Sequence, residues 1–177
     1  AESFGKEGAF ITKCTAQLMR DFGCIPSPQN AFYLNLGLES LHVRMPRHVE
    51  NAQAAAEFLD AQDKVLKVNY PGLPGNRYHG LAEKYLHGGG CGVVSFELSG
   101  GREAAERFMG KLKLIAIETH VADARSCCLH PASSTHRQLN DSQLAAAGVA
   151  PGLIRVSLGL EDREDLLADL KHALEAV

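Results

Sequence analysis

Apolar residues in the first third of the chain recur every three or four positions. Between residues 7 and 22 the repeating set is Phe10, Ile11, Cys14, Leu18, Met19 and Phe22. This period predicts a helix over 7–22, which Gly23 can terminate. Ser27 followed by Pro28 has the residue types of a second helix start, and its apolar stripe runs to about residue 61. Pro46 lies inside that stripe and lacks a backbone donor, so it predicts a kink or a break into two helices there.

The rest of the chain changes to shorter patterns, several with a period of two. The predicted strands are residues 65–70, 87–98, 113–118, 125–129 and 152–162. In the last of these, Ile154, Val156 and Leu158 share one face, while Arg155 and Ser157 share the other.

Helices are expected between and after these strands. One covers residues 101–113, with a face of Ala104, Ala105, Phe108, Met109 and Leu112. Another starts near Asp162 and buries Leu166, Leu167, Leu170, Ala173 and Leu174. Long helices followed by short mixed strands predict an α+β fold, with a small open mixed or antiparallel sheet covered by helices on one face.

Composition narrows the function classes. The 177 residues are 45% hydrophobic and 22% charged, as in an ordinary globular domain, and the net charge of −3 gives no basic surface for nucleic acid. No apolar run approaches the ~20 residues that span a bilayer, and the amino terminus has no secretory pattern. The five cysteines are odd in number and lack metal or redox spacing, so we expect reduced thiols in a cytoplasmic protein. A strand would point adjacent Cys127 and Cys128 to opposite faces.

Three sequence features could mark sites, but their patterns favour structural roles. The glycine run in 87–92 precedes a strand, whereas phosphate loops follow one and open a helix. His120, His130 and His136 lack the spacing of zinc ligands, so we expect no metal, with His130 and His136 satisfying backbone groups of a tight turn. Lys13 lies on a partly apolar helix face, where we expect it to be solvated rather than reactive.

Arg155 is the strongest candidate for a binding residue. A charged side chain in the middle of an apolar strand is costly to bury unless it meets a partner. Its planar guanidinium matches a carboxylate, and the pattern leaves two interpretations open: an internal salt bridge or a bound ligand.

Six segments occur in a fixed order along nearly the whole chain. They are IPSPQNAF (25–32), RMPRHVENAQAAAEFL (44–59), VNYPGLPGNRYH (68–79), VVSFELSGGREAAERFM (93–109), VADARSCCLHPASSTHRQL (121–139) and GLIRVSLGLEDREDLLADL (152–170). Together they resemble the carboxy-terminal part of the Cys/Met-metabolism family of pyridoxal-phosphate enzymes. The segment HPASSTHRQL is most similar to the O-acetylhomoserine sulfhydrylase branch.

The resemblance implies a domain organisation and a site. Residues 1–40 would be the end of the cofactor domain and the start of a connecting helix, and residues 41–177 the small domain of a fold-type I enzyme. Arg155 would bind the α-carboxylate of an amino-acid substrate such as O-acetylhomoserine. His120 stands where the sulfhydrylases carry asparagine and the lyases serine, so it would line the substrate side. Ala122 replaces the glycine of the family's glycine–aspartate pair.

The same resemblance implies that other parts of the active site lie elsewhere. The family's Schiff-base lysine and its remaining cofactor contacts precede the matched segments, so we expect no catalytic and no cofactor-binding residue in this chain. Pyridoxal phosphate would belong to the full-length enzyme, and the chain alone would be inactive. Methionine gamma-lyase-like or cystathionine gamma-synthase-like chemistry, or a non-catalytic binding or assembly module, are the alternatives. Because Phe10, Leu18, Phe22 and Phe32 would lose a packing partner, we also expect a homo-oligomer.

Overall fold

A computed structural model describes residues 5–86 and 89–177, and it divides the chain into two compact units, residues 1–41 and 42–177. The division falls one residue from the domain boundary that the resemblance implies. The assignment of the first unit to the end of a cofactor domain stays a prediction.

The first unit is helical, as the period predicts. Helix α1 (Gly5–Thr12) continues through a π-helical segment, η1 (Lys13–Met19), into α2 (Arg20–Phe22). Gly23 ends it in the left-handed conformation with φ of 67°, which glycine adopts without steric cost. Helix α3 (Pro28–Glu39) begins as expected, because the Ser27 hydroxyl accepts a hydrogen bond from the Asn30 backbone N–H at 3.1 Å.

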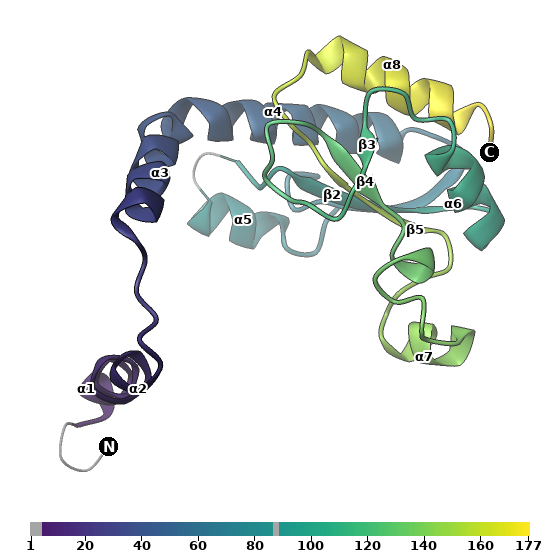
Figure 1. Cartoon of the computed structure of the whole chain (residues 1–177). Helices are drawn as coiled ribbons and strands as arrows, with labels where there is room; N and C mark the ends of the chain where they lie inside the picture. The colour runs from purple at the N-terminus through teal and green to yellow at the C-terminus, as the bar shows by residue number, and fades with distance from the viewer. Residues whose placement is uncertain (1–4, 87–88) are drawn as a thin grey trace. The chain divides into compact units, whose positions relative to one another are not determined.

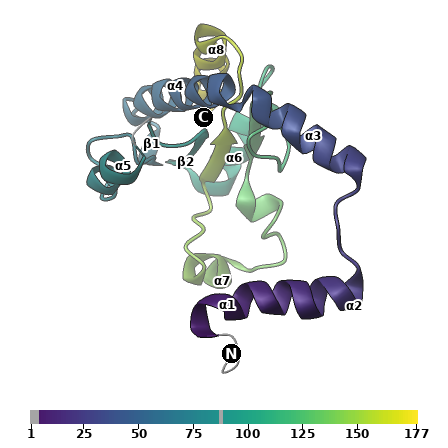
Figure 2. The ribbon, with the colours of Figure 1, turned by 90° about the vertical axis from the view of Figure 1, so that its left-hand side faces the viewer.

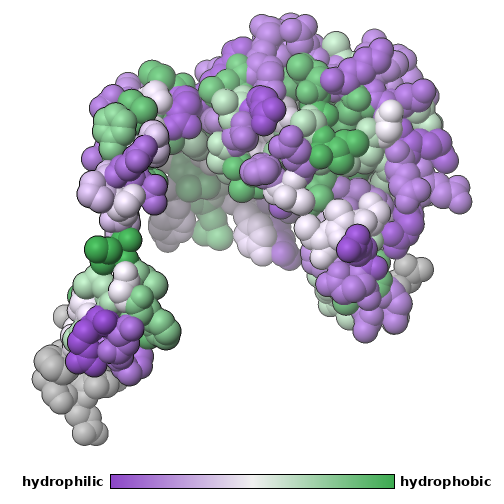
Figure 3. All heavy atoms as spheres, in the orientation of Figure 1, coloured by the Kyte–Doolittle hydropathy of each residue, from purple (hydrophilic) through white to green (hydrophobic). Residues whose placement is uncertain are grey.

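Large apolar side chains of these helices are exposed, as expected for Phe10, Leu18, Phe22 and Phe32. The full exposed set in α1–α3 is Phe10, Ile11, Leu18, Met19, Phe22, Phe32, Tyr33, Leu34, Leu36 and Leu38. Figure 3 shows hydrophobic surface over these helices. Such a set is larger than the scattered apolar residues of an ordinary surface.

The predicted break into two helices occurs at Ser40 rather than at Pro46. Helix α4 (Leu41–Asp60) runs through Pro46, and Ser40 just before it leaves the helical region with φ of −104° and ψ of 2°. The buried residues of α4 all follow the proline, beginning with His48. Packing of those later turns holds the helix although Pro46 cannot donate a backbone hydrogen bond.

Five strands of the described residues form one mixed sheet in the second unit. They are β1 (Val65–Asn69), β2 (Val93–Leu98), β3 (Ala116–Ile117), β4 (Cys127–Leu129) and β5 (Leu153–Ser157). The spatial order is β1-β2-β5-β4-β3; β3 runs parallel to β4, and the other pairs are antiparallel. The predicted α+β class with a small mixed sheet is confirmed.

Helices α4, α6 (Gly101–Met109) and α8 (Arg163–Leu174) cover one face of this sheet (Figures 1 and 2). The inward strand residues include Val68, Val94, Phe96, Leu98, Cys128, Ile154 and Val156, with Leu158 just beyond β5. Phe96 meets Phe108 of α6 edge to face, with ring centroids 5.5 Å apart. The alternation predicted for residues 154–158 therefore has the correct faces.

Helix α8 begins next to Asp162, its N-cap, as predicted, but its buried face includes an acid. The Asp162 carboxylate accepts from the Glu164 N–H, and Leu166, Leu170, Ala173 and Leu174 are buried. Asp169 is buried beside them, whereas Leu167 is only partly covered. The Asp169 carboxylate accepts three backbone hydrogen bonds at 2.9–3.0 Å from the loop that leads into β3.

Three short helical segments lie outside the predicted pattern: α5 (His79–Tyr85), η2 (Pro131–Ser133) and α7 (Asp141–Ala146). Of these, α7 carried a sequence signal. Asn140 and Gln143 exchange side-chain and backbone hydrogen bonds as a capping box. Within residues 5–86 and 89–177, no helix is both long and apolar enough to cross a membrane.

Candidate functional site

Arg155 lies in the middle of β5, which is the central strand of the sheet. It pairs with Ser95 on β2 and with Leu129 on β4. Its neighbours in sequence, Ile154 and Val156, point into the helix-covered core, so the partly buried Arg155 points to the opposite face. The strand thus presents a guanidinium on the face that α4, α6 and α8 leave open.

One end of the guanidinium is already held. Nη2 donates a hydrogen bond to the Thr119 carbonyl at 2.9 Å. Among the described residues, Arg155 forms no ion pair with an aspartate or a glutamate, so the internal salt bridge considered from sequence is not found. A guanidinium has five N–H donors. The remaining donors are those that a ligand carboxylate would use.

The loop that follows β3 is fixed against the same sheet face by three side chains. Besides the Arg155 contact, the Cys127 thiol donates to the His120 carbonyl at 2.9 Å. The Ala122 N–H donates to the buried Ser157 hydroxyl at 3.1 Å. Residues 119–122 therefore form a segment of fixed backbone beside Arg155, called the wall below. The sequence did not indicate that Cys127 and Ser157 hold this segment in place.

His120 sits on this wall, but its ring points elsewhere in the described structure. The side chain is 67% exposed, and Nδ1 lies 3.3 Å from the Glu118 carboxylate. The backbone at His120 is thus beside the Arg155 contact, while its imidazole pairs with Glu118. The role of His120 on the substrate side stays a prediction.

The loop also contains a carboxyl group with a lowered pKa, that of Asp123. The Asp123 carboxylate accepts a 3.0 Å hydrogen bond from the Arg125 backbone N–H, which lowers the pKa of Asp123. The positive charge of Arg125, and that of His120 when protonated, act in the same direction. Asp123 is therefore ionised near neutral pH.

Ala122 has an unusual backbone conformation in this loop. Its φ is 60°, in the left-handed region that favours glycine. The resemblance implies glycine at this position, where this chain has alanine. The loop therefore carries local backbone strain next to the candidate site.

A half-buried carboxylate, that of Glu161, lies at the base of the loop. Glu161 accepts hydrogen bonds from the Ser126 backbone N–H at 2.6 Å and from the Ser126 hydroxyl at 2.8 Å. The same hydroxyl accepts the Gly159 N–H at 2.7 Å. A Cβ at Gly159 would collide with the Ala124 carbonyl, so this close approach requires glycine.

The two adjacent cysteines point to opposite faces, as predicted. Cys127 is on the Arg155 face, whereas the Cys128 sulfur lies in the core, 3.1 Å from the Met109 sulfur. Burial raises the pKa of both thiols, so neither is activated as a nucleophile. All five cysteines lie in the described ranges and are unpaired.

The other histidine candidates have structural partners. His130 is buried between the Ser133 hydroxyl and the Pro151 carbonyl, each 2.8 Å from a ring nitrogen. The expectation that the ring satisfies backbone groups of the tight turn is wrong, because its turn partner is a side-chain hydroxyl and Pro151 lies outside that turn. The His136 ring instead pairs with the Thr135 hydroxyl at 2.9 Å. In the part of the chain that the structure describes, no group of three or more His, Cys, Asp or Glu residues could hold a metal.

Neither Lys13 nor the described glycines of the run before β2 fit a pyridoxal-phosphate site. Lys13 is exposed, and its Nζ donates to Gln17 at 2.6 Å, so it has neither the desolvated pocket nor the neighbouring cation that a Schiff-base lysine needs. In the glycine run before β2, Gly89 instead packs on α4, since a Cβ there would collide with Val49, and Gly90 lies against Tyr70 and Pro71. Residues 87 and 88 of that run lie outside the described residues.

The chain matches known proteins along nearly all of its length. Residues 6–175 match the family model described as Cys/Met metabolism PLP-dependent enzyme. O-acetyl-L-homoserine sulfhydrylase 1 of Thermus thermophilus is 47% identical over 173 residues, and L-methionine gamma-lyase of Pseudomonas putida is 41% identical over 169 residues. They match 98% and 95% of this chain.

A solved structure shows the same fold. It is a putative O-acetylhomoserine (thiol)-lyase of Campylobacter jejuni with N'-pyridoxyl-lysine-5'-monophosphate, 40% identical, with a TM-score of 0.86 over 94% of this chain. The chain covers 40% of that structure, 41% of the Thermus protein and 42% of the Pseudomonas protein, so it spans about two fifths of their length. The chain belongs to the Cys/Met-metabolism family of pyridoxal-phosphate-dependent enzymes.

Proposed function

We propose that this chain supplies the substrate-carboxylate side of an O-acetylhomoserine sulfhydrylase-like enzyme. Such an enzyme replaces the acetate group of its substrate with a sulfur nucleophile and holds its pyridoxal phosphate with residues outside this chain. The observation that carries the proposal is the position of Arg155, central in β5 and free of an acidic partner among the described residues. The names of the Thermus and Campylobacter relatives support the substrate class.

The guanidinium is suited to this task because it is held before a ligand arrives. The Thr119 carbonyl takes one N–H of Nη2, and the wall of residues 119–122 fixes that carbonyl. A preorganised planar fork loses little conformational freedom when it binds a carboxylate. His120 would line the substrate side of the wall.

The test uses an enzyme that joins this chain to a cofactor-binding portion like that of its relatives. Arg155→Lys keeps the charge but loses the fork, and hydrogen bonds to charged groups contribute about 1.5–3 kcal/mol. We expect KM for O-acetylhomoserine to rise roughly 10- to 100-fold. Arg163→Lys on the exposed start of α8 is the control. An unchanged KM in Arg155→Lys would contradict the assignment.

The 177 residues alone are proposed to be inactive. Incubation with pyridoxal phosphate, borohydride reduction and intact-mass analysis should give no stoichiometric adduct, because Lys13 is exposed and hydrogen-bonded to Gln17. A single adduct mapped to one lysine would show that the chain has a cofactor site of its own.

Elimination is the second candidate activity, and the 41% identity to L-methionine gamma-lyase of Pseudomonas putida supports it. Turnover of O-acetylhomoserine plus sulfide, compared with methionine alone, separates the two reactions in the joined enzyme. A non-catalytic binding or assembly module would show neither reaction.

We also propose that the chain self-associates, because the large apolar side chains of α1–α3 are exposed. Light scattering of the purified chain tests this point. A monodisperse monomer would contradict it.

A further inference from the structure

A histidine and a glutamate of α5 point toward the same spot in a surface cavity away from Arg155. His79 is the first residue of this helix, and Glu83 follows one turn later. The His79 Nδ1 lies 2.9 Å from the Pro71 carbonyl. A carbonyl only accepts, so Nδ1 carries the hydrogen and the neutral ring presents a lone pair at Nε2.

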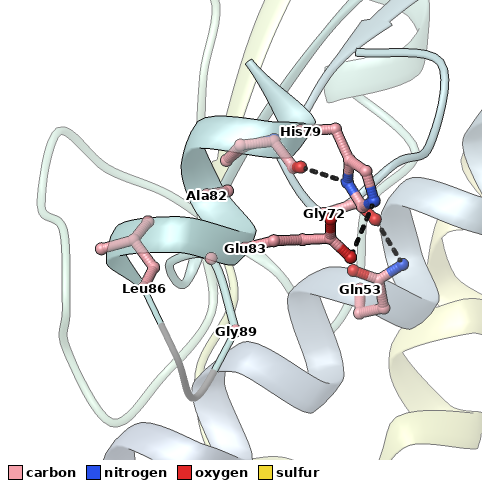
Figure 4. A pocket seen from close by; sticks show the side chains of 9 residues that line it. Gln53, Gly72, His79, Ala82, Glu83, Leu86 and Gly89 are labelled. Carbon is pink, nitrogen blue, oxygen red and sulfur yellow. Dashed lines mark hydrogen bonds and ion pairs between the residues drawn. The ribbon is translucent and has the colours of Figure 1, made fainter. Parts of the chain in front are cut away.

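That lone pair faces a second acceptor. The His79 Nε2 is 3.6 Å from the Glu83 Oε1, and Figure 4 shows the two groups directed at each other. The separation exceeds the 2.7–3.2 Å of an N–H···O hydrogen bond. Two acceptors at this distance repel unless a cation lies between them or the ring is protonated.

We propose that His79 and Glu83 form a binding site for a divalent transition-metal ion of the zinc type. Bonds of about 2.05 Å to nitrogen and 2.1 Å to oxygen, at a tetrahedral angle, place the two ligand atoms about 3.4 Å apart. The observed 3.6 Å matches this value to within a small side-chain rotation.

Two further features of the surroundings fit a metal ion. The Pro71 carbonyl fixes the tautomer and the ring orientation, as the outer partner of a metal-binding histidine usually does. The cavity has a volume of about 380 Å³, so water molecules have room to complete the coordination. Its wall includes Gln53, whose amide donates to Glu57 and, at 3.4 Å, to the Gly72 carbonyl.

The ligand types select the metal class. An imidazole with one carboxylate suits zinc, nickel or copper, whereas magnesium and calcium prefer oxygen ligands throughout. No third His, Cys, Asp or Glu joins the pair among the described residues, so the site is open and held by two side chains. Such a site would link the first turn of α5 to its second and stabilise the segment after β1.

The first experiment is calorimetric titration of the full chain with Zn²⁺ at neutral pH. His79→Ala and Glu83→Gln should each weaken binding at least tenfold. The control is His172→Ala on α8, where His172 Nδ1 lies 3.7 Å from the Glu175 carboxylate and no backbone carbonyl of the described residues orients the ring. That variant should bind like the wild type. Equal affinity in all four proteins would overturn the proposal.

The second experiment excludes the thiols, since Cys24 and Cys91 are exposed and cysteine binds zinc. The Co²⁺ complex should lack the thiolate-to-metal charge-transfer band, because nitrogen and oxygen ligands hold the metal at this site. A thiolate band that persists in His79→Ala would assign the metal to cysteine instead. In the wild type, NMR signals of the His79 ring should shift on metal addition, which does not depend on any variant folding.

Discussion

Asp169→Asn should strongly destabilise the second unit. The Asp169 Oδ1 accepts from the Lys113 N–H at 2.9 Å, and Oδ2 accepts from Leu114 and Ile115 at 3.0 and 2.9 Å. An asparagine has one acceptor oxygen, so at least one of the three N–H groups must face an amide donor. The bonds that remain lose the charge of their acceptor.

The magnitude follows from these contacts. Each hydrogen bond to a charged group contributes about 1.5–3 kcal/mol, so losing one and weakening two should lower the free energy of unfolding by about 3 kcal/mol. That is a large fraction of the 5–15 kcal/mol typical of a domain. Urea denaturation followed by circular dichroism measures the difference, provided that the m-value is unchanged.

Asp165→Asn is the matched control, because Asp165 is exposed in the first turn of the same helix. Its loss should cost only the ~0.3–1 kcal/mol of a charge near a helix amino terminus. A difference between the two variants of less than about 0.5 kcal/mol would refute the reasoning. Hydrogen exchange at residues 113–115 should also accelerate in Asp169→Asn alone.

Two further predictions concern backbone strain and pH. Ala122→Gly should raise the melting temperature by about 2 °C, since relief of roughly 1–2 kcal/mol of left-handed strain exceeds the cost of glycine flexibility. The control, Ala145→Gly at an exposed position of α7, should lower the melting temperature. A lower melting temperature in both variants would contradict the strain at Ala122. Burial raises the pKa of Tyr70 to about 12, with Cys91 nearby adding to the effect, above the ordinary value near 10. Stability should therefore be complete below pH 10 and fall by about 2 kcal/mol as pH rises towards 12, because the unfolded state loses its proton first. Tyr70→Phe should show a shallower alkaline loss in the same titration, and an equal slope would contradict this origin.

Local signals in the sequence were sufficient for much of the fold. The hydroxyl of Ser27 before Pro28 marks a helix start through contacts within three residues. The alternation around Arg155 also depends only on the two-residue period of a strand. These elements could be predicted because their causes lie within a few positions of one another.

Other features depend on partners that the sequence does not bring together. Pro46 is a local helix breaker, yet packing of the turns after it holds α4, and the break moved to Ser40. Asp169 occupies a helix position where an acid normally faces solvent, and its partners belong to a distant loop. The hydrogen bond between Glu161 and Ser126 at the base of the candidate site likewise joins residues that are 35 positions apart in the sequence.

The order of the strands has a consequence for how the second unit assembles during synthesis. The last strand in sequence, β5, lies between β2 and β4 and joins the two halves of the sheet. While the ribosome is making β1 to β4, the β1–β2 pair and the β3–β4 pair each lack their neighbour and expose an unpaired edge. The nascent chain therefore stays open to mispairing until β5 emerges, and chaperone protection would matter most in that interval.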